Sequence, residues 1–352
     1  MKKLICLLLC TVFIYTAILC SCGGNGEDTY IPTPDTAEQT ETVPVTQTEA
    51  LTEAETAANT ETNTETEAET EPPAPSPYGI FTYENNKVNV AVTSPVAILI
   101  DVNSKEILYM NCEPDKKLYP ASTTKLLTAI VALHSCDKSM VIKPGDELKL
   151  VASDSTVAYV KTNHELTVEM LIEGMLLPSG GDAAYALAAG VGRKIAGDDS
   201  LSGKDAVDVF VGEMNRYGKE VLGLQNSHFT CPDGYHDDDH YSTIIDMMTI
   251  AYAAMSEPVI TKYAQLASDD VRYASGHKNT WTNTNKLVDP DSQYFYENAT
   301  GLKTGTTEEA GCCLVSSAAL GVRKVLAGVF GAKDNKERYN DSRSLLVVGI
   351  NR

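Results

Sequence analysis

The chain has 352 residues, of which 43% are hydrophobic, and its 48 acidic and 28 basic residues give a formal net charge of −20. Such an acidic balance argues against a nucleic-acid partner, because a phosphate backbone binds basic surfaces. Once the polar N-terminal stretch is set aside, the remaining length is enough for one large hydrophobic core, or for a core with a subdomain.

Residues 1–22 have the pattern of a bacterial export signal. Two lysines precede the apolar stretch from Leu4 to Leu19, which is too short and too early to be a membrane-spanning helix of the mature protein. Residues 19–23 resemble a lipoprotein cleavage box, in which Cys22 becomes the lipid-bearing first residue. The alternatives are a plain secretory signal cut near Ser21 and a single-span anchor. We expect the mature protein at the extracytoplasmic face of the cell membrane, or secreted if Cys22 carries no lipid.

Residues 23–77 are predicted to form a disordered tether. The stretch 25–76 holds thirteen Asp and Glu and no Lys or Arg, interleaved with Thr, Ala and Pro. Such a composition cannot bury a core. A random coil of this length spans roughly 40 Å, which would lift a following domain well off a membrane.

The rest of the chain has strand patterns at its two ends and helical patterns between them. Residues 95–101 and 106–110 are predicted to be two strands joined by a tight turn. Helical periodicity then appears in five stretches, at 122–134, 167–177, 182–190, 204–222 and 242–255. Three strands and a final helix follow, at 301–304, 312–319, 323–330 and 336–347. The simplest packing places all strands in one mostly antiparallel sheet and part of the helical middle in a separate lobe.

Ser122-Thr-Thr-Lys125 places a hydroxyl and an amine one helical turn apart, directly after Pro120. Because serine is a poor nucleophile at its own pKa, an amine on the same helix face can activate it if burial keeps that amine neutral. A helix start also favours negative charge, such as an oxyanion. The pattern therefore indicates an acyl-transfer enzyme. The alternative is a polar helix start with a solvated lysine.

Further motifs follow in order. Ser179-Gly180-Gly181 comes after an apolar helical stretch, and Lys303-Thr304-Gly305 comes before a strand pattern. With the segments 229–234, 240–243 and 283–287, these motifs resemble the D-alanyl-D-alanine carboxypeptidase family. These are low-molecular-mass penicillin-binding proteins of the serine β-lactamase/transpeptidase superfamily, and the resemblance covers about residues 80 to 350. Ordered motifs at plausible spacing are far more specific than any one motif alone.

The resemblance implies a fold as well as an activity. The expected architecture is an α+β, β-lactamase/transpeptidase-like domain over residues 78–352, with a five-stranded sheet between helices and the site at its junction with a helical lobe. We expect no C-terminal β-domain, because only about fifty residues follow the K-T-G element. The expected reaction is removal of the terminal D-alanine from peptidoglycan stem peptides through an acyl-enzyme. β-Lactams would then be covalent inhibitors.

The same resemblance assigns the catalytic roles. Ser122 is the acylated nucleophile, Lys125 its general base, and Ser179 a proton relay toward the leaving amine. Lys303 is an electrostatic partner across the cleft. Two cations beside a buried lysine are expected to push its proton off, so Lys125 should titrate low.

Substrate binding is assigned to the second half of the chain. Thr304 and Arg338 would hold the substrate carboxylate, and the backbone amides of Ser122 and Thr306 would form the oxyanion hole. Gly305 completes the K-T-G motif. A solvated surface position is the alternative for Arg338.

Gly181 departs from the family pattern, because an asparagine is expected there. A glycine has no amide to bridge the lysine and the substrate carbonyl, so one hydrogen bond of about 1.5–3 kcal/mol is absent or replaced by water or a neighbouring group. The consequence is a slower enzyme, an altered β-lactam affinity, or a non-catalytic lipoprotein that binds the cell wall. A β-lactamase-like hydrolase is a further alternative, although no E-x-x-L-N segment is found to position a deacylating water.

No cofactor or metal is expected. Residues 236–240 place two imidazoles around three carboxylates, but a hydrated acidic turn explains that composition without a cation. The cysteines beyond the signal region are odd in number and lack C-x-x-C spacing, which indicates small buried apolar residues rather than disulfides or a zinc site. They are Cys112, Cys136, Cys231, Cys312 and Cys313.

Overall fold

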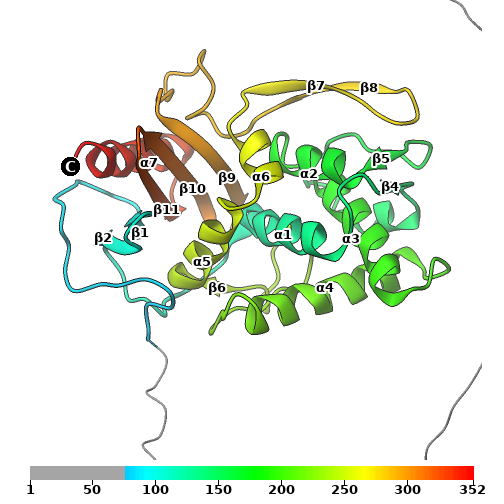
Figure 1. Ribbon diagram of the computed structural model, residues 1–352, viewed down its shortest axis with the longest axis horizontal. Helices are drawn as coiled ribbons and strands as arrows, with labels where there is room; N and C mark the ends of the chain where they lie inside the picture. The colour runs from blue at the N-terminus through cyan, green and yellow to red at the C-terminus, as the bar shows by residue number, and fades with distance from the viewer. Residues whose placement is uncertain (1–75) are drawn as a thin grey trace, which may run out of the picture. The chain divides into compact units, whose positions relative to one another are not determined.

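The computed structural model describes residues 76–352. A five-stranded sheet brings together strands from the beginning and the end of this part of the chain. The strands pair in the order β2-β1-β11-β10-β9, and every pairing is antiparallel (Figure 1). The predicted sheet is therefore confirmed. The strand bounds are Val96–Asp101 for β1, Glu106–Met110 for β2, Ala299–Thr307 for β9, Gly311–Leu320 for β10 and Arg323–Ala332 for β11.

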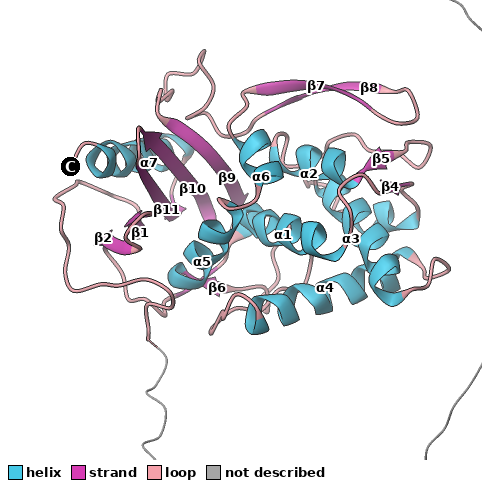
Figure 2. Cartoon of the chain, in the orientation of Figure 1, coloured by secondary structure: helices cyan, strands magenta, loops and turns pink. Residues whose placement is uncertain are grey.

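Both faces of this sheet are covered, because alternate residues of the central strands are apolar on each side. Helix α7 (Asn335–Ile350) packs on one face, where Leu345 and Leu346 join a small core with Leu99 and Leu314. The other face packs on the helical lobe (Figure 2). Adjacent cysteines of β10 divide between the two cores, as strand alternation predicts: these are Cys312 and Cys313.

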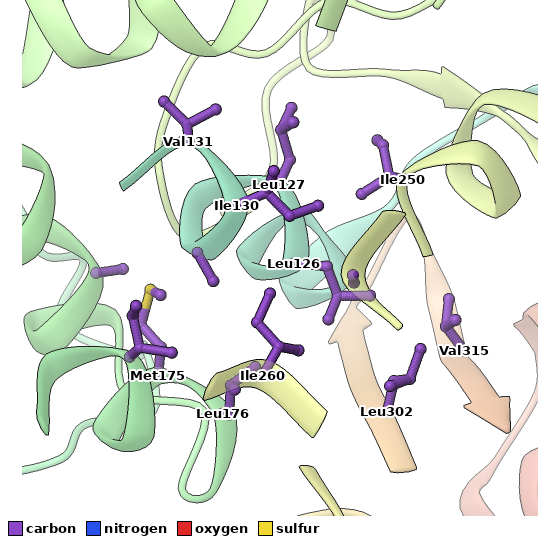
Figure 3. Close-up of a cluster of buried hydrophobic side chains, with 14 of the residues drawn as sticks. Leu126, Leu127, Ile130, Val131, Met175, Leu176, Ile250, Ile260, Leu302 and Val315 are labelled. Atoms are coloured by element: carbon purple, nitrogen blue, oxygen red, sulfur yellow. The ribbon is translucent and has the colours of Figure 1, made fainter. Parts of the chain in front are cut away.

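Helix α1 (Lys125–Ser135) is the centre of the large core. Its apolar side chains are surrounded by side chains from three other helices and the sheet (Figure 3). The labelled members of this cluster are Leu126, Leu127, Ile130, Val131, Met175, Leu176, Ile250, Ile260, Leu302 and Val315. The burial of α1 among these elements carries the residues at its N-terminus to the junction of the lobe and the sheet.

The helical lobe contains the other predicted helices close to their predicted positions. Their bounds are Val168–Leu176 for α2, Gly181–Ala196 for α3, Gly203–Glu220 for α4 and Ile244–Ala254 for α5. Threonine or serine side chains cap α2, α4 and α5 by accepting backbone N–H groups of the first turn, which explains why these helices begin where they do.

Two elements were not predicted. Helix α6 (Pro258–Ala264) has only seven residues, too few for a clear helical period. The hairpin of β7 (Ser268–Arg272) and β8 (Lys278–Thr282) buries one large side chain from each strand, Val271 and Trp281, between polar positions. One buried residue in each strand is a weak hydrophobic pattern.

Short elements complete the described chain. Four strand segments of two residues, which form two pairs, and a 3₁₀ helix connect the larger elements, and three of the four segments each add one apolar side chain to the large core. Their bounds are Lys117–Leu118 for β3, Val141–Ile142 for β4, Asp146–Leu150 for η2, Leu166–Thr167 for β5 and Ser242–Thr243 for β6; β3 pairs with β6, and β4 with β5.

The predicted signal at 1–22, with its lipid anchor Cys22, lies outside the described residues, as does the tether at 23–77 except for its last two residues. Within residues 76–352, no helix is both long enough and apolar enough to cross a membrane. Two of the five cysteines in this part are buried as predicted, Cys312 and Cys313, whereas the other three are half-buried.

Candidate active site

Ser122 and Lys125 lie in hydrogen-bonding contact at the N-terminal end of α1. Lys125 Nζ is 2.7 Å from Ser122 Oγ and also donates to the Asp233 carbonyl oxygen at 2.7 Å. The lysine is 1% exposed, and the serine is half-buried. The alternative of a solvated lysine at this position is therefore wrong.

The serine precedes the α-helix rather than lying in it. Residues Ala121–Thr124 form a 3₁₀ turn, η1, and α1 begins at Lys125, so the predicted helix start at 122 was three residues early. Ala121 has a φ of +47°, which is uncommon for a residue with a side chain. The Thr123 hydroxyl closes the turn by donating to the Pro120 carbonyl at 2.6 Å. This turn directs Ser122 toward Lys125.

A loop after α4 packs directly under the turn. Gly234 has a φ of +80°, and a Cβ atom there would lie 1.9 Å from the Ala121 carbonyl oxygen, so only glycine fits. The close approach brings the Asp233 carbonyl within reach of both Lys125 and Ser122. In the sequence, this Pro-Asp-Gly segment supports the family resemblance, but no role was predicted for it. Its turn-forming composition was the available signal.

Ser179 and Lys303 form a second serine and lysine pair. Lys303 Nζ donates to Ser179 Oγ at 2.8 Å and to the Thr304 carbonyl at 3.0 Å. Ser179 lies between α2 and α3 with a φ of +65°, and Thr156 donates to its carbonyl at 2.7 Å. Positive φ at a residue other than glycine is concentrated at functional sites. The structure thus brings residues 179 and 303 together as the resemblance implied.

Burial governs the protonation of both lysines. It lowers the pKa of Lys125, although the nearby Asp233 carboxylate opposes this shift. It also lowers the pKa of Lys303 to well below its usual value, and the positive charges of Lys125 and Arg338 lower it further. The predicted direction for Lys125 is confirmed, and burial is the main cause, whereas the repulsion by neighbouring cations acts on Lys303.

Strand β9 lies at the edge of the sheet, directly against the 3₁₀ turn. A Cβ atom at Gly305 would be only 3.0 Å from the Ser122 backbone nitrogen, so the glycine permits this approach. Thr306 follows as an exposed residue on the same strand. The Thr304 hydroxyl shares a hydrogen bond of 2.6 Å with the hydroxyl of Thr284, a contact that the sequence did not reveal.

Arg338 is buried beside β9, with 5% of its surface exposed. Its guanidinium donates to the Gly305 carbonyl at 3.1 Å, to the Thr306 hydroxyl at 3.2 Å and to the Cys313 carbonyl at 3.3 Å. The alternative of a solvated surface position is therefore wrong. The arginine places a fixed positive charge next to the K-T-G strand, where an anionic group would be attracted.

A cavity of about 280 Å³ opens over this cluster. It exposes the nucleophile and base on one side, the loop after α4 on another, and the end of β9 on the third. Its lining residues are Ser122, Lys125, Asp154, Ser155, Thr156, Asp233, Gly234, Tyr235, His236, Thr306, Thr307, Glu308 and Glu309.

The two histidines of the acidic turn face different surroundings. His236 packs edge-on against the Tyr119 ring, with ring centroids 4.8 Å apart. His240 points inward, where its Nε2 lies 2.9 Å from the Thr124 hydroxyl. No group of three or more metal-ligating side chains converges anywhere in residues 76–352.

Comparison with known proteins agrees with this geometry. The family model of the D-alanyl-D-alanine carboxypeptidases, Peptidase_S11, matches residues 82–334. The chain belongs to this family. The match spans both serine and lysine pairs and the K-T-G strand, whereas Arg338 lies just beyond its end.

Individual family members cover the same region. The D-alanyl-D-alanine carboxypeptidase DacF of Bacillus subtilis is 33% identical over 246 residues, which are 69% of this chain and 58% of DacF. The D-alanyl-D-alanine carboxypeptidase of Streptomyces sp. strain K15 is 33% identical over 248 residues, which are 67% of this chain and 80% of that protein. The chain therefore spans less than two thirds of the length of DacF.

Solved structures of family relatives share the fold. The crystal structure of the Streptomyces K15 DD-transpeptidase superposes with a TM-score of 0.66 at 28% identity, covering 74% of this chain and 98% of that one. An ampicillin-bound structure of penicillin-binding protein D2 from Listeria monocytogenes superposes with a TM-score of 0.59 at 25% identity, covering 74% and 99%. The predicted β-lactamase/transpeptidase-like α+β class is confirmed.

Proposed function

We propose that this chain is a serine-type D-Ala-D-Ala carboxypeptidase that removes the terminal D-alanine from peptidoglycan stem peptides and is acylated by penicillins. The observation that carries the proposal is the buried contact of 2.7 Å between Lys125 Nζ and Ser122 Oγ, inside a domain of the carboxypeptidase family. A nucleophile in contact with an amine of lowered pKa can attack an amide carbonyl near neutral pH.

Acylation would proceed in two proton transfers. Lys125 takes the proton of the Ser122 hydroxyl while the serine oxygen bonds to the carbonyl carbon of the penultimate D-alanine. The backbone amides of Ser122 and Thr306 stabilise the resulting oxyanion. The C–N bond then breaks, and the proton that Lys125 took passes through Ser179, which is held by Lys303 at 2.8 Å, to the leaving D-alanine amine. Water then attacks the acyl carbon while Lys125 takes a proton from it, and the Ser122 oxygen leaves with that proton as the shortened peptide is released.

The substrate carboxylate would bind at the K-T-G strand. Arg338 supplies a buried positive charge, and its hydrogen bonds to Gly305 and Thr306 orient the strand against which the carboxylate lies. Thr304 offers a hydroxyl that is already positioned by Thr284. A charged acceptor in such a site gains more from hydrogen bonding than a neutral one.

The test compares two substrates. Diacetyl-L-Lys-D-Ala-D-Ala should release free D-alanine, whereas the same peptide with a C-terminal amide should react about 10–100-fold more slowly in kcat/KM, since one hydrogen bond to a charged group is worth about 1.5–3 kcal/mol. Released amino acid is quantified by chromatography. Equal rates for the two peptides would contradict the assigned role of Thr304 and Arg338.

A non-catalytic wall-binding protein is the second candidate function, because Gly181 lacks the amide expected in the middle motif. The same assay separates the two functions. A binding protein would retain the intact tripeptide and release no D-alanine, while the enzyme would turn it over.

We also propose that the protein acts at the outer face of the cell membrane, anchored by a lipid on Cys22. The supporting observations are the export pattern of residues 1–22 and the acidic composition of 23–77. Cys22→Ala should move the protein from the membrane fraction to the medium, as followed by fractionation and immunoblotting. An unchanged membrane fraction would instead favour a single-span anchor.

A further inference from the structure

The position that lacks an asparagine in this chain is filled by a carboxylate. A Cβ atom built on Gly181 would lie 2.9 Å from Asp233 Oδ2, closer than to any other group. The remaining neighbours are the Ser155 Cβ at 3.4 Å and the Thr156 carbonyl at 3.5 Å. The space that a side chain at 181 would enter is therefore occupied by Asp233, which comes from a different loop.

Asp233 is held firmly in this space. Its carbonyl oxygen accepts hydrogen bonds from Lys125 and from Ser122, at 2.7 and 3.3 Å, so its backbone touches both reacting groups. Its carboxylate accepts the Tyr235 backbone N–H at 3.1 Å, and only 3% of the residue is exposed. Moving the carboxylate out of this space would break its hydrogen bond with the Tyr235 N–H.

We propose that Asp233 replaces the asparagine of the middle motif and is a positioning residue that acts on the reaction through Lys125. The proposal rests on the proposed serine acyl-transfer function. A carboxylate can accept hydrogen bonds but cannot donate them, whereas an asparagine amide does both. Asp233 therefore fills the space of the asparagine and acts on Lys125 through its charge rather than through a side-chain hydrogen bond, and the donor that would face the substrate carbonyl is lost.

The electrostatic consequence follows from the proton balance. During acylation the Ser122 proton moves to Lys125, the serine oxygen bonds to the carbonyl carbon, and the lysine becomes an ammonium ion. The Asp233 carboxylate takes no part in this proton transfer. Its attraction for the ammonium ion makes Lys125 a stronger base, but it also keeps the lysine protonated to a higher pH in the free protein.

The other ionisable groups near Lys125 oppose the lowering of its pKa less than Asp233 does. Burial lowers the pKa of Lys125, and Asp233, Cys231 and Asp182 oppose that shift in this order. Lys303 is the other buried amine nearby, and burial lowers its pKa as well. The Asp182 carboxylate is occupied by three backbone N–H groups, those of Ala158, Val160 and Ala183.

The titratable groups around Asp233 are neutral near pH 7. Burial raises the pKa of the Cys231 thiol to about 12, and it also raises the pKa of the Tyr185 hydroxyl. Burial lowers the pKa of His240 to about 4. Lys125 is thus the group on which the Asp233 charge acts when its protonation changes.

Asp233→Asn tests the proposal, because it removes the charge and keeps the shape. The acylation rate with a fluorescent penicillin is measured from pH 5 to 10 by stopped flow. Removing the carboxylate lowers the pKa of Lys125 further, so the acidic limb of the profile should move down by about one pH unit. The plateau rate should fall by about tenfold, since the lysine becomes a weaker base.

A position swap supplies a second readout. Gly181→Asn alone forces its side chain against the Asp233 carboxylate and should slow acylation, while Gly181→Asn combined with Asp233→Ala makes room for the amide and should react faster than the Gly181→Asn single variant. Asp198→Asn, which removes an exposed carboxylate in the turn after α3, should reproduce the wild-type profile.

The possible results distinguish a failure of the role proposed for Asp233 from a failure of the proposed acyl-transfer function. A wild-type protein that no penicillin acylates would remove the proposed function itself. A wild type that is acylated, with an Asp233→Asn acidic limb that coincides with it, would overturn the inference alone. If Asp233→Asn does not fold, the swap decides: a slower double variant than Gly181→Asn would likewise overturn the inference.

Discussion

Ser122→Ala should abolish covalent labelling by a fluorescent penicillin, reducing the acylation rate by about 10⁴-fold or more. The serine oxygen is the atom that would bond to the β-lactam carbonyl, and the hydroxyl of Ser179 is engaged by Lys303 at 2.8 Å rather than by Lys125. Labelling is read by gel fluorescence, and the adduct by intact mass. Alanine is well tolerated in a half-buried turn, so the variant should retain its fold.

The matched control is Ser200→Ala, which removes a hydroxyl from an exposed turn. This variant should label like the wild type. Circular dichroism of both variants shows whether the fold is intact. Labelling of a folded Ser122→Ala protein at the wild-type rate would assign the nucleophile to another residue.

Lys125→Ala should reduce acylation by about 10²–10⁴-fold, which is the usual contribution of a general base. The amine is in contact with the nucleophile at 2.7 Å, and within residues 76–352 no other side-chain nitrogen is recorded bonding to Ser122 Oγ. Lys149→Ala, which removes an exposed amine, is the matched control and should react like the wild type.

The pH dependence of the wild type gives the sign of this effect. Lys125 accepts a proton only in its neutral form, so acylation should rise with pH through the pKa of Lys125 and then level off. Burial lowers that pKa from the ordinary value of 10.5, so the midpoint of the rise should lie below pH 10.5. A rise centred near pH 10.5, or a residual Lys125→Ala reaction with the same rise, would show that another group is the base.

The contacts that can be predicted best from the sequence are local. Ser122 and Lys125 are three residues apart, a spacing that places both side chains on the same side of a helical turn. Strand alternation is equally local, and it places the adjacent Cys312 and Cys313 in different cores.

Local patterns failed where an element depends on what packs over it. The 3₁₀ turn at Ala121–Thr124 exists because Gly234 and Gly305 press against it from a loop and a strand distant in sequence. Periodicity alone continues the helix through Ser122. The hairpin of β7 and β8 was missed for a similar reason, since its buried Trp281 packs against α2 at Gly174.

By itself the sequence determined which chemical groups the chain carries, their order, and the pairing of a hydroxyl with an amine one turn away. Only the tertiary structure decided that Lys303 meets Ser179 across 124 positions, that Arg338 is buried beside β9, and that Asp233 fills the space at Gly181. The physical reason is that such contacts arise when separate elements bury their apolar faces together. The polar groups then meet because the core places their backbones, and no local period in the sequence records that distance.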